Sequence, residues 1–187
     1  MNKSVGFSEL ARQLAYWLRD SGVIVIMGIG NPIRRDDFVG MATVRQLERI
    51  APKNVRVIEA GEVPESYLGR VEELRPSHVL MIDAAEMGEH PGSVRLVSPR
   101  KIEGFSLSTH TLPLSVVSEY LAKRTKAKIA LLAIQPKDLD FGEGLSSELS
   151  ERVGTLAKAI AEAIKLSGKK RAKGQRPPKR VRQRSAR

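Results

Sequence analysis

The sequence predicts an α/β protein, a three-layer α/β/α sandwich in which a mainly parallel central sheet is covered by helices on both faces. Segments with apolar residues at helical spacing alternate along the chain with short apolar runs. Those runs are rich in β-branched residues and largely lack polar alternation, as is typical of strands buried on both sides. Strands that alternate with helices are joined by crossover connections, which favour a parallel sheet.

The first half of the chain alternates three helices with three strands. Leu10, Leu14 and Leu18 have helical spacing, and Gly22 ends their helix. In the second helix we expect four residues to face the core, namely Val39, Val44, Leu47 and Ile50. In order, the expected elements are helix 7–20, strand 23–27, helix 36–50, strand 55–59, helix 65–74 and strand 79–82.

The second half of the chain predicts two further strands and two helices. Residues 93–97 alternate between polar and apolar side chains, which suits an edge strand, whereas residues 129–134 form a continuous apolar run. The last helix is marked by apolar residues three or four positions apart. In order, these elements are strand 93–97, helix 112–123, strand 129–134 and helix 149–164.

The chain divides into a folded part and a basic tail. We expect residues 1–167 to form a single α/β domain, with helix 7–20 appended to its core. The net charge is +11, but ten Lys and Arg and no acid lie in residues 168–187, which leaves 22 basic and 21 acidic residues elsewhere. This tail has too little apolar surface to offset the entropy of ordering, so we expect it to be disordered.

The composition excludes several classes of function and leaves one open. Without Cys there is no disulfide framework, thiolate nucleophile or zinc finger. No apolar run approaches the roughly 20 residues of a membrane-spanning helix, and the N-terminus has no signal pattern, so we expect a cytoplasmic protein without a membrane span. The tail could contact nucleic acid weakly and without sequence preference, because it has no aromatic residue for base stacking. The alternative is a solvated tail that aids solubility or steers an acidic partner.

Polar residues follow the predicted strands. In open α/β sheets, ligands bind beyond the carboxyl ends of the strands. The segments at those ends are 28–37, 60–65, 83–92, 98–113 and 135–146, and together they supply acids, a His and a Gln. We therefore expect the functional site at this edge of the sheet.

The glycines after the first strand do not predict a dinucleotide site. Gly28 and Gly30 match the start of the dinucleotide fingerprint, but Ile33 stands where a third small residue is needed. Asp36 and Asp37 follow where a pyrophosphate would require favourable charge, and two carboxylates would repel it. The segment also lacks the Gly-Lys-Ser/Thr ending of a P-loop.

Acids at two positions along this edge are candidates for chemistry. At the start of the second helix Asp36 can act as the cap, which lets Asp37 project from the first turn. Asp83 comes directly after an apolar strand, where a carboxylate is costly unless it is paired or bound to a cation. The alternative for Asp83 is that it accepts hydrogen bonds from the backbone of a turn at residues 84–88.

The three histidines have different contexts. His78 precedes a strand at the opposite edge of the sheet and is expected to be a surface residue. His90 lies in a Gly-Pro loop seven residues after Asp83, so it is a candidate ligand. His110 lies just before a helix with Pro113 in its first turn. A helix N-terminus disfavours the imidazolium form, and a neutral ring can ligate a metal, which favours His110 over His90.

At these positions the chain resembles the hydrogenase maturation proteases, the endopeptidases that remove a C-terminal peptide from the large subunit of nickel–iron hydrogenases. Four blocks in order, within residues 22–165, carry the resemblance. The blocks are Gly28-Ile-Gly30-Asn31 with Asp36 and Asp37; Asp83-Ala84 with Gly88, Pro91 and Gly92; His110 ahead of a Leu-bearing helix; and Ile134-Gln135-Pro136 with Gly142, Gly144, Leu145 and Ser146. The chain departs from the family pattern at Phe38, where Gly is frequent.

The resemblance implies a site and a substrate. It implies that Asp37, Asp83 and His110 contact the metal and carry catalysis. Residues that would support the site loops are Gly28, Gly30, Asn31, Asp36, Glu62 and Gln135. The implied metal is nickel, supplied by the precursor of the hydrogenase large subunit, which is the implied partner; cysteines of that precursor could complete the metal shell. The family fold is a three-layer sandwich with a twisted sheet.

Several hypotheses about the chemistry stay open at this point. A metal-polarised carbonyl and a metal-activated water are two routes to hydrolysis. Asp37 or Asp83 acting as a general base is a third. A different interpretation is a non-proteolytic binding module that senses nickel in the precursor without cutting it, since the sequence offers no Ser-His-Asp or Cys nucleophile.

Overall fold

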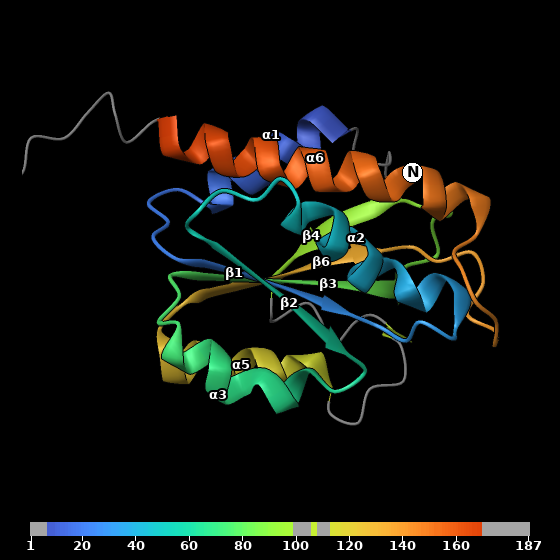
Figure 1. The fold of residues 1–187 in the computed structure, drawn as a ribbon, viewed down its shortest axis with the longest axis horizontal. Coiled ribbons are helices and arrows are strands. Elements are labelled where there is room, and N and C mark those ends of the chain that lie inside the picture. Colours follow the sequence, from blue (N-terminus) through green and yellow to red (C-terminus); the bar gives the residue numbers. More distant parts are fainter. Residues whose placement is uncertain (1–6, 99–105, 108–112, 170–187) are drawn as a thin grey trace, which may run out of the picture.

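The computed structural model describes residues 7–98, 106–107 and 113–169, and these form an α/β fold. The main path of the sheet runs in the order β2-β1-β3-β6-β4 (Figure 1). These strands span Ile24–Ile29 (β1), Val55–Gly61 (β2), His78–Glu86 (β3), Val94–Val97 (β4) and Lys128–Ile134 (β6). The first four along the path are parallel, and β4 is the antiparallel edge strand. The predicted fold class and the edge strand are confirmed.

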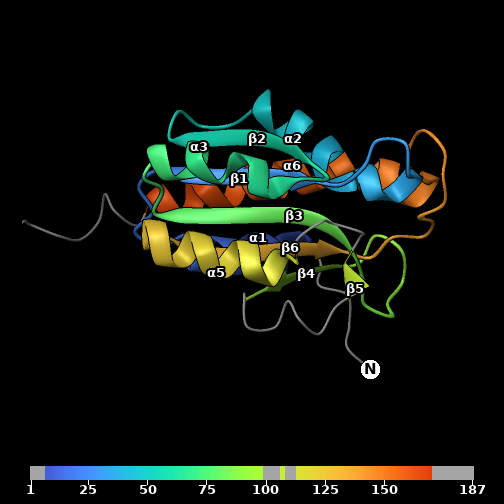
Figure 2. The same ribbon diagram turned by 90° about the horizontal axis from the view of Figure 1, so that it is seen from below.

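Helices cover both faces of this sheet (Figure 1). One layer contains α1 (Phe7–Trp17), α2 (Val39–Glu48) and α6 (Ser147–Lys169), and the other contains α3 (Leu68–Glu73) and α5 (Leu114–Thr125). Figure 2 views the molecule from the side of α3 and α5. Because side chains alternate along each strand, each strand contributes to the core on both faces of the sheet. Ile24 and Ile26 pack toward α1, α2 and α6, whereas Val25 and Met27 pack toward α3 and α5. This two-sided burial is why β1 is apolar throughout.

The strands extend further than the apolar runs predict. β1 continues through Gly28 to Ile29, and β3 continues through Asp83 to Glu86. A short strand that the pattern did not predict, β5 (Ser106–Leu107), pairs antiparallel with Ala85 and Glu86. Two residues are too few to show a period in the sequence, and only the neighbouring strand defines them.

The second predicted helix is divided. A 3-10 helix, η1 (Arg35–Phe38), precedes α2, and another, η2 (Pro64–Tyr67), precedes α3. Val39, Val44 and Leu47 are buried as expected, but Ile50 lies beyond the end of α2 and is 44% exposed. The core assignment of Ile50 is therefore wrong, because the helix ends before the turn that would bring it inward.

His78 is also placed differently from the prediction. It is the first residue of β3 and only 2% exposed, so it is not a surface residue. Its ring makes an edge-on contact with Trp17, with 5.0 Å between ring centroids. The sequence around His78 is polar, but α1 covers this end of β3. The contact is made by Trp17, 61 positions earlier in the chain, which no local pattern around His78 could indicate.

The N-terminal helix is part of the folded body. Leu10, Leu14 and Leu18 are buried, and α1 packs against α6. At the other end, α6 continues to Lys169, slightly past the expected domain end at residue 167. The division into a domain and a tail stays a prediction, because residues 170–187 lie outside the described part. Within the described ranges, no helix is long and apolar enough to cross a membrane.

Candidate functional site

Three glycines allow η1 and α2 to lie directly on the carboxyl ends of β1 and β3. A Cβ added at Gly40 would lie 2.2 Å from the Ile82 carbonyl oxygen and 2.3 Å from that of Ile29. A Cβ at Gly30, where φ is +130°, would lie 1.7 Å from the Asp37 carbonyl oxygen. At Gly28 it would lie 2.6 Å from the Gly40 carbonyl oxygen. The glycines of the first block therefore serve close backbone packing, not phosphate binding.

The loop after β1 is folded around Asp37. This carboxylate is buried, and its Oδ2 accepts a hydrogen bond from the Asn31 backbone N–H at 2.8 Å. The Asn31 side-chain oxygen accepts one from the Ile33 N–H at 2.9 Å, which closes a turn within the loop. Asn31 therefore holds the loop, and through its N–H it orients Asp37.

Asp83 is fully buried inside β3, where it pairs with Ala133 of β6. The residue is not followed by the turn that one interpretation of the sequence required, because residues 84–86 continue the strand. Asp83 nevertheless lies near the carboxyl ends of the neighbouring strands. The pairing of β1 with β3 ends at Ile82, and the pairing of β6 with β3 ends at Ala84. Because η1 contacts β3, Asp37 and Asp83 come from two elements that meet at this edge.

Asp36 does not act as a helix cap, contrary to the prediction. Its fully buried carboxylate instead accepts four hydrogen bonds from the loop after β6. The donors are the backbone N–H groups of Lys137 (2.8 Å), Asp138 (3.1 Å) and Ser146 (2.7 Å) and the Ser146 hydroxyl (2.9 Å). Asp36 thus connects two loops that are up to 110 positions apart in the sequence. No local sequence pattern could indicate a contact over that separation.

Gln135 joins the end of β6 to the segment that follows β3. Its side-chain oxygen accepts hydrogen bonds from the N–H groups of Met87 (2.7 Å) and Glu89 (3.2 Å). Its side-chain nitrogen donates to the Glu86 carboxylate at 2.8 Å and to the Pro136 carbonyl at 3.1 Å. These contacts join the end of β6 to residues 86–89, so Gln135 fixes the segment of chain that follows Asp83.

The other residues predicted for the site are Glu62, His90 and His110. Glu62 is exposed and follows Gly61, whose carbonyl accepts a hydrogen bond from the Gly30 N–H at 3.1 Å. His90 is exposed. His110 lies outside the described residues. Within residues 7–98, 106–107 and 113–169, no three His, Cys, Asp or Glu are grouped so that they could hold a metal ion.

Comparison with known proteins identifies the family. Residues 41–163 match the sequence pattern of the family described as hydrogenase maturation protease. A protein of Methanocaldococcus jannaschii that carries the same description is 38% identical over 161 residues, which cover 82% of this chain and 86% of that protein. The chain belongs to the hydrogenase maturation protease family. The hydrogenase 3 maturation protease of Escherichia coli is 31% identical over 71% of this chain and 85% of its own length.

Solved structures of hydrogenase maturation proteases have the same fold. The [NiFe] hydrogenase maturation protease HycI from Thermococcus kodakarensis superimposes with a TM-score of 0.76 at 34% identity, over 82% of this chain and 99% of that one. The endopeptidase HycI from Escherichia coli gives a TM-score of 0.63 at 27% identity, over 79% and 91% of the two chains. The predicted function is confirmed at this level: the chain is a hydrogenase maturation endopeptidase, which processes the C-terminus of a nickel–iron hydrogenase large subunit.

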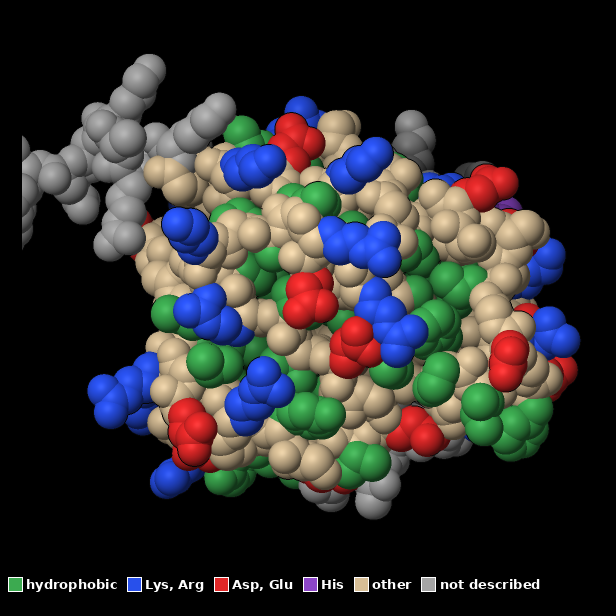
Figure 3. Space-filling model, in the orientation of Figure 1, with side chains coloured by type: hydrophobic (Ala, Val, Ile, Leu, Met, Phe, Trp, Pro, Cys, Tyr) green, Lys and Arg blue, Asp and Glu red, His purple; other side chains and the backbone are tan. Residues whose placement is uncertain are grey.

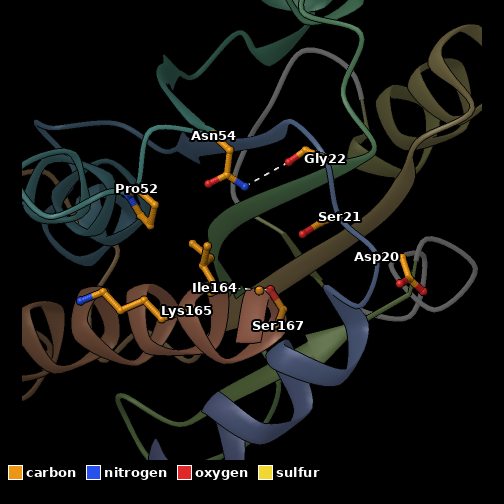
Figure 4. A pocket seen from close by; sticks show the side chains of 9 residues that line it. Asp20, Ser21, Gly22, Pro52, Asn54, Ile164, Lys165 and Ser167 are labelled. Carbon is orange, nitrogen blue, oxygen red and sulfur yellow. Dashed lines mark hydrogen bonds between the residues drawn. The ribbon is translucent and has the colours of Figure 1, made fainter. Parts of the chain in front are cut away.

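A hollow of about 410 Å³ lies at the other edge of this protease (Figure 4). Residues before β1 and β2 and residues near the end of α6 line it, among them Gly22, Asn54 and Lys165. The Asn54 side chain closes one side by donating a hydrogen bond to the Gly22 carbonyl at 3.1 Å. Because these residues precede the strands, the hollow is separate from the edge where Asp37 and Asp83 lie.

Proposed function

We propose that this endopeptidase recognises the nickel-loaded precursor of a hydrogenase large subunit by binding the nickel that the precursor carries. Asp37, Asp83 and His110 would be the protein's ligands to that nickel. The observation that carries the proposal is that Asp37 and Asp83 are both buried and belong to two elements, η1 and β3, that contact each other at the carboxyl edge of the sheet. Carboxylate oxygens from two contacting elements are ligands that suit a divalent ion.

The described residues on either side of His110 support its inclusion. Leu107 pairs with Ala85, two residues beyond Asp83, and α5 begins at Leu114. A chain of three residues spans at most about 11 Å, so position 110 is within reach of the end of β3. Along β3, Met81 and Ala85 pack toward the layer that contains α5, so alternation directs Asp83 to that same layer.

The donor set fits nickel as part of the substrate. Two carboxylate oxygens and one imidazole nitrogen suit a borderline divalent ion and leave coordination positions open. Ligands of the precursor itself can occupy those positions, so the ion would link the enzyme to its substrate and fix the polypeptide next to the carboxylates. Within the protein, the Asn31 N–H orients Asp37, and the ladder to β6 fixes the backbone of Asp83.

Cleavage of nickel-loaded and nickel-free precursor tests the proposal. The wild-type enzyme should remove a C-terminal peptide only from the loaded form, and Asp37→Ala and Asp83→Ala should lose at least about 100-fold in rate while they stay folded. Glu162→Gln, which alters an exposed acid on α6, is the matched control and should cleave at the wild-type rate. Equal cleavage of both precursors, or wild-type activity in either Asp variant, would refute nickel recognition by these residues.

Asp37→Asn separates ligation from proton transfer. Asparagine keeps an oxygen donor but cannot accept a proton as a carboxylate does. If Asp37 serves only as a ligand, we expect Asp37→Asn to retain measurable binding and cleavage, with binding weakened. A variant that binds the loaded precursor as tightly as wild type but does not cut it would identify Asp37 as the general base instead.

A further inference from the structure

The carboxyl edge of the sheet carries an apolar surface that the fold itself does not use. Phe141, in the loop after β6, is 76% exposed, and Ile33, in the loop after β1, is 53% exposed. The two side chains belong to adjacent backbone segments, because the Gly142 N–H donates to the Ile33 carbonyl at 2.9 Å. We call Ile33 and Phe141 the rim patch. Figure 3 shows hydrophobic side chains at the right-hand lower edge of the molecule, where Figure 1 places the loop after β6.

The rim patch is held in place by many contacts. The Arg35 N–H donates to the Gly142 carbonyl at 2.9 Å, and the Arg34 guanidinium donates twice to the Leu139 carbonyl, at 3.2 and 3.0 Å. The same guanidinium lies 5.4 Å from the centre of the Phe141 ring. Together with the four hydrogen bonds to Asp36, these contacts fix both loops. An exposed aromatic ring on a fixed loop loses little entropy when it is covered by a partner.

The rim patch also lies within a few residues of the candidate site. The backbone of Arg35, which pairs with Gly142, is two residues before Asp37. Two residues of chain span at most about 7 Å, so a polypeptide that places its scissile bond at Asp37 can reach the patch with residues a few positions away. The polypeptide of the precursor is therefore the occupant that this position favours.

We propose that the rim patch docks the precursor polypeptide beside its scissile bond, with Phe141 as the main apolar contact. This inference rests on the proposed function, because it takes Asp37 as part of the active site. An aromatic side chain that becomes buried in a complex is typical of the few residues that dominate binding. Its removal should weaken binding of the precursor and leave the chemical step intact. We expect a rise in KM of about tenfold, with kcat changed less than twofold.

Three variants test the docking surface without a threat to the fold. Phe141→Ala removes the ring, Phe141→Leu keeps part of its apolar area, and Tyr16→Ala removes an aromatic residue that is 67% exposed on α1, away from this edge. Cleavage of nickel-loaded precursor should give a raised KM for Phe141→Ala, an intermediate KM for Phe141→Leu and the wild-type value for Tyr16→Ala. A KM for Phe141→Ala within twofold of wild type, or an effect confined to kcat, would overturn the proposal.

Direct binding of the loaded precursor distinguishes this proposal from the proposed function. If wild type cleaves nickel-loaded and nickel-free precursor equally, the proposed function fails, but the dissociation constant still tests docking: a tenfold weaker complex with Phe141→Ala supports docking, and an unchanged constant overturns it. Sedimentation of the enzyme alone gives the remaining outcome. If wild type is a dimer that Phe141→Ala dissociates, while the dissociation constant for precursor is unchanged, a second copy of this chain occupies the patch and the proposal is wrong.

Discussion

Asp36 and Asp37 are adjacent in sequence but have different surroundings. The carboxylate of Asp36 is fully engaged by four hydrogen bonds from the loop after β6, whereas that of Asp37 is oriented by the Asn31 N–H at the edge of the sheet. The first residue positions a loop, and the second is the candidate ligand. A pair of acids in one motif can therefore divide structure and chemistry between them.

Replacement of Asp36 should chiefly affect stability. In Asp36→Asn, one carboxylate oxygen becomes an NH₂ group that faces a backbone N–H, and the remaining hydrogen bonds lose their charge. We expect the free energy of unfolding to fall by about 2–4 kcal/mol, as measured by urea denaturation. Asp140→Asn, an exposed acid in the same loop, should change it by less than about 0.5 kcal/mol. A small effect at Asp36 would mean that the loops are held by other contacts.

His78 links three segments at the opposite edge of the sheet. Its Nε2 lies 3.0 Å from the Trp17 carbonyl oxygen, which can only accept, so Nε2 carries the proton. Its Nδ1 lies 3.0 Å from the Ser77 hydroxyl oxygen, and that oxygen accepts a hydrogen bond from the Gly22 N–H at 2.8 Å. Burial lowers the pKa of His78 below its ordinary value, and the Lys128 charge lowers it further, although the Trp17 carbonyl and Asp20 act in the opposite direction.

This burial predicts how stability depends on pH. Because the pKa of His78 is lower in the folded state, the unfolded chain takes up a proton first as the pH falls below about 6.5, and stability is lost from there down to the folded-state pKa. We expect His78→Gln to reduce the slope of unfolding free energy against pH in this window by up to about 1.4 kcal/mol per pH unit. His90→Gln, at an exposed position, should leave the slope unchanged. Equal slopes in wild type and His78→Gln would show that another group titrates.

At the scale of elements, the approach of α2 to the sheet depends on glycine. In Gly40→Ala the new methyl group would meet backbone carbonyls of both β1 and β3. Backbone cannot rotate away as a side chain can, so α2 and the preceding η1 must move. We expect a loss of about 3 kcal/mol or more in unfolding free energy, together with reduced cleavage, because Asp37 would shift relative to Asp83.

Gly154→Ala is the matched control for this prediction. Gly154 lies within α6, and an added Cβ would meet no atom within 4 Å. The same substitution should here raise stability by about 0.5–1 kcal/mol, because alanine loses less backbone entropy in a helix. Opposite signs at two helical glycines, measured by the same denaturation experiment, would separate close packing from helix propensity. A neutral Gly40→Ala would contradict the packing argument.

At the scale of the whole molecule, charge is divided between the folded part and residues 168–187. Because α6 continues to Lys169, truncation after that residue removes nine of the ten basic residues in 168–187 and leaves the described structure intact. We expect unchanged thermal stability and unchanged cleavage of precursor at about 0.3 M salt, where long-range charge steering is screened. At low salt, any retention on immobilised nucleic acid should be lost. Loss of cleavage at high salt would show that the tail belongs to the site.

The sequence by itself determined the order of the longer helices and strands, the mainly parallel sheet and the family, because hydrophobic periodicity and the four ordered blocks are local features of the chain. Only the tertiary structure decided what Asp36, Gln135 and His78 do. Each is defined by groups 46 to 110 positions away, and such partners leave no local pattern. It also decided that β3 continues past Asp83, since pairing with β6 and β5 extends a strand beyond its apolar run.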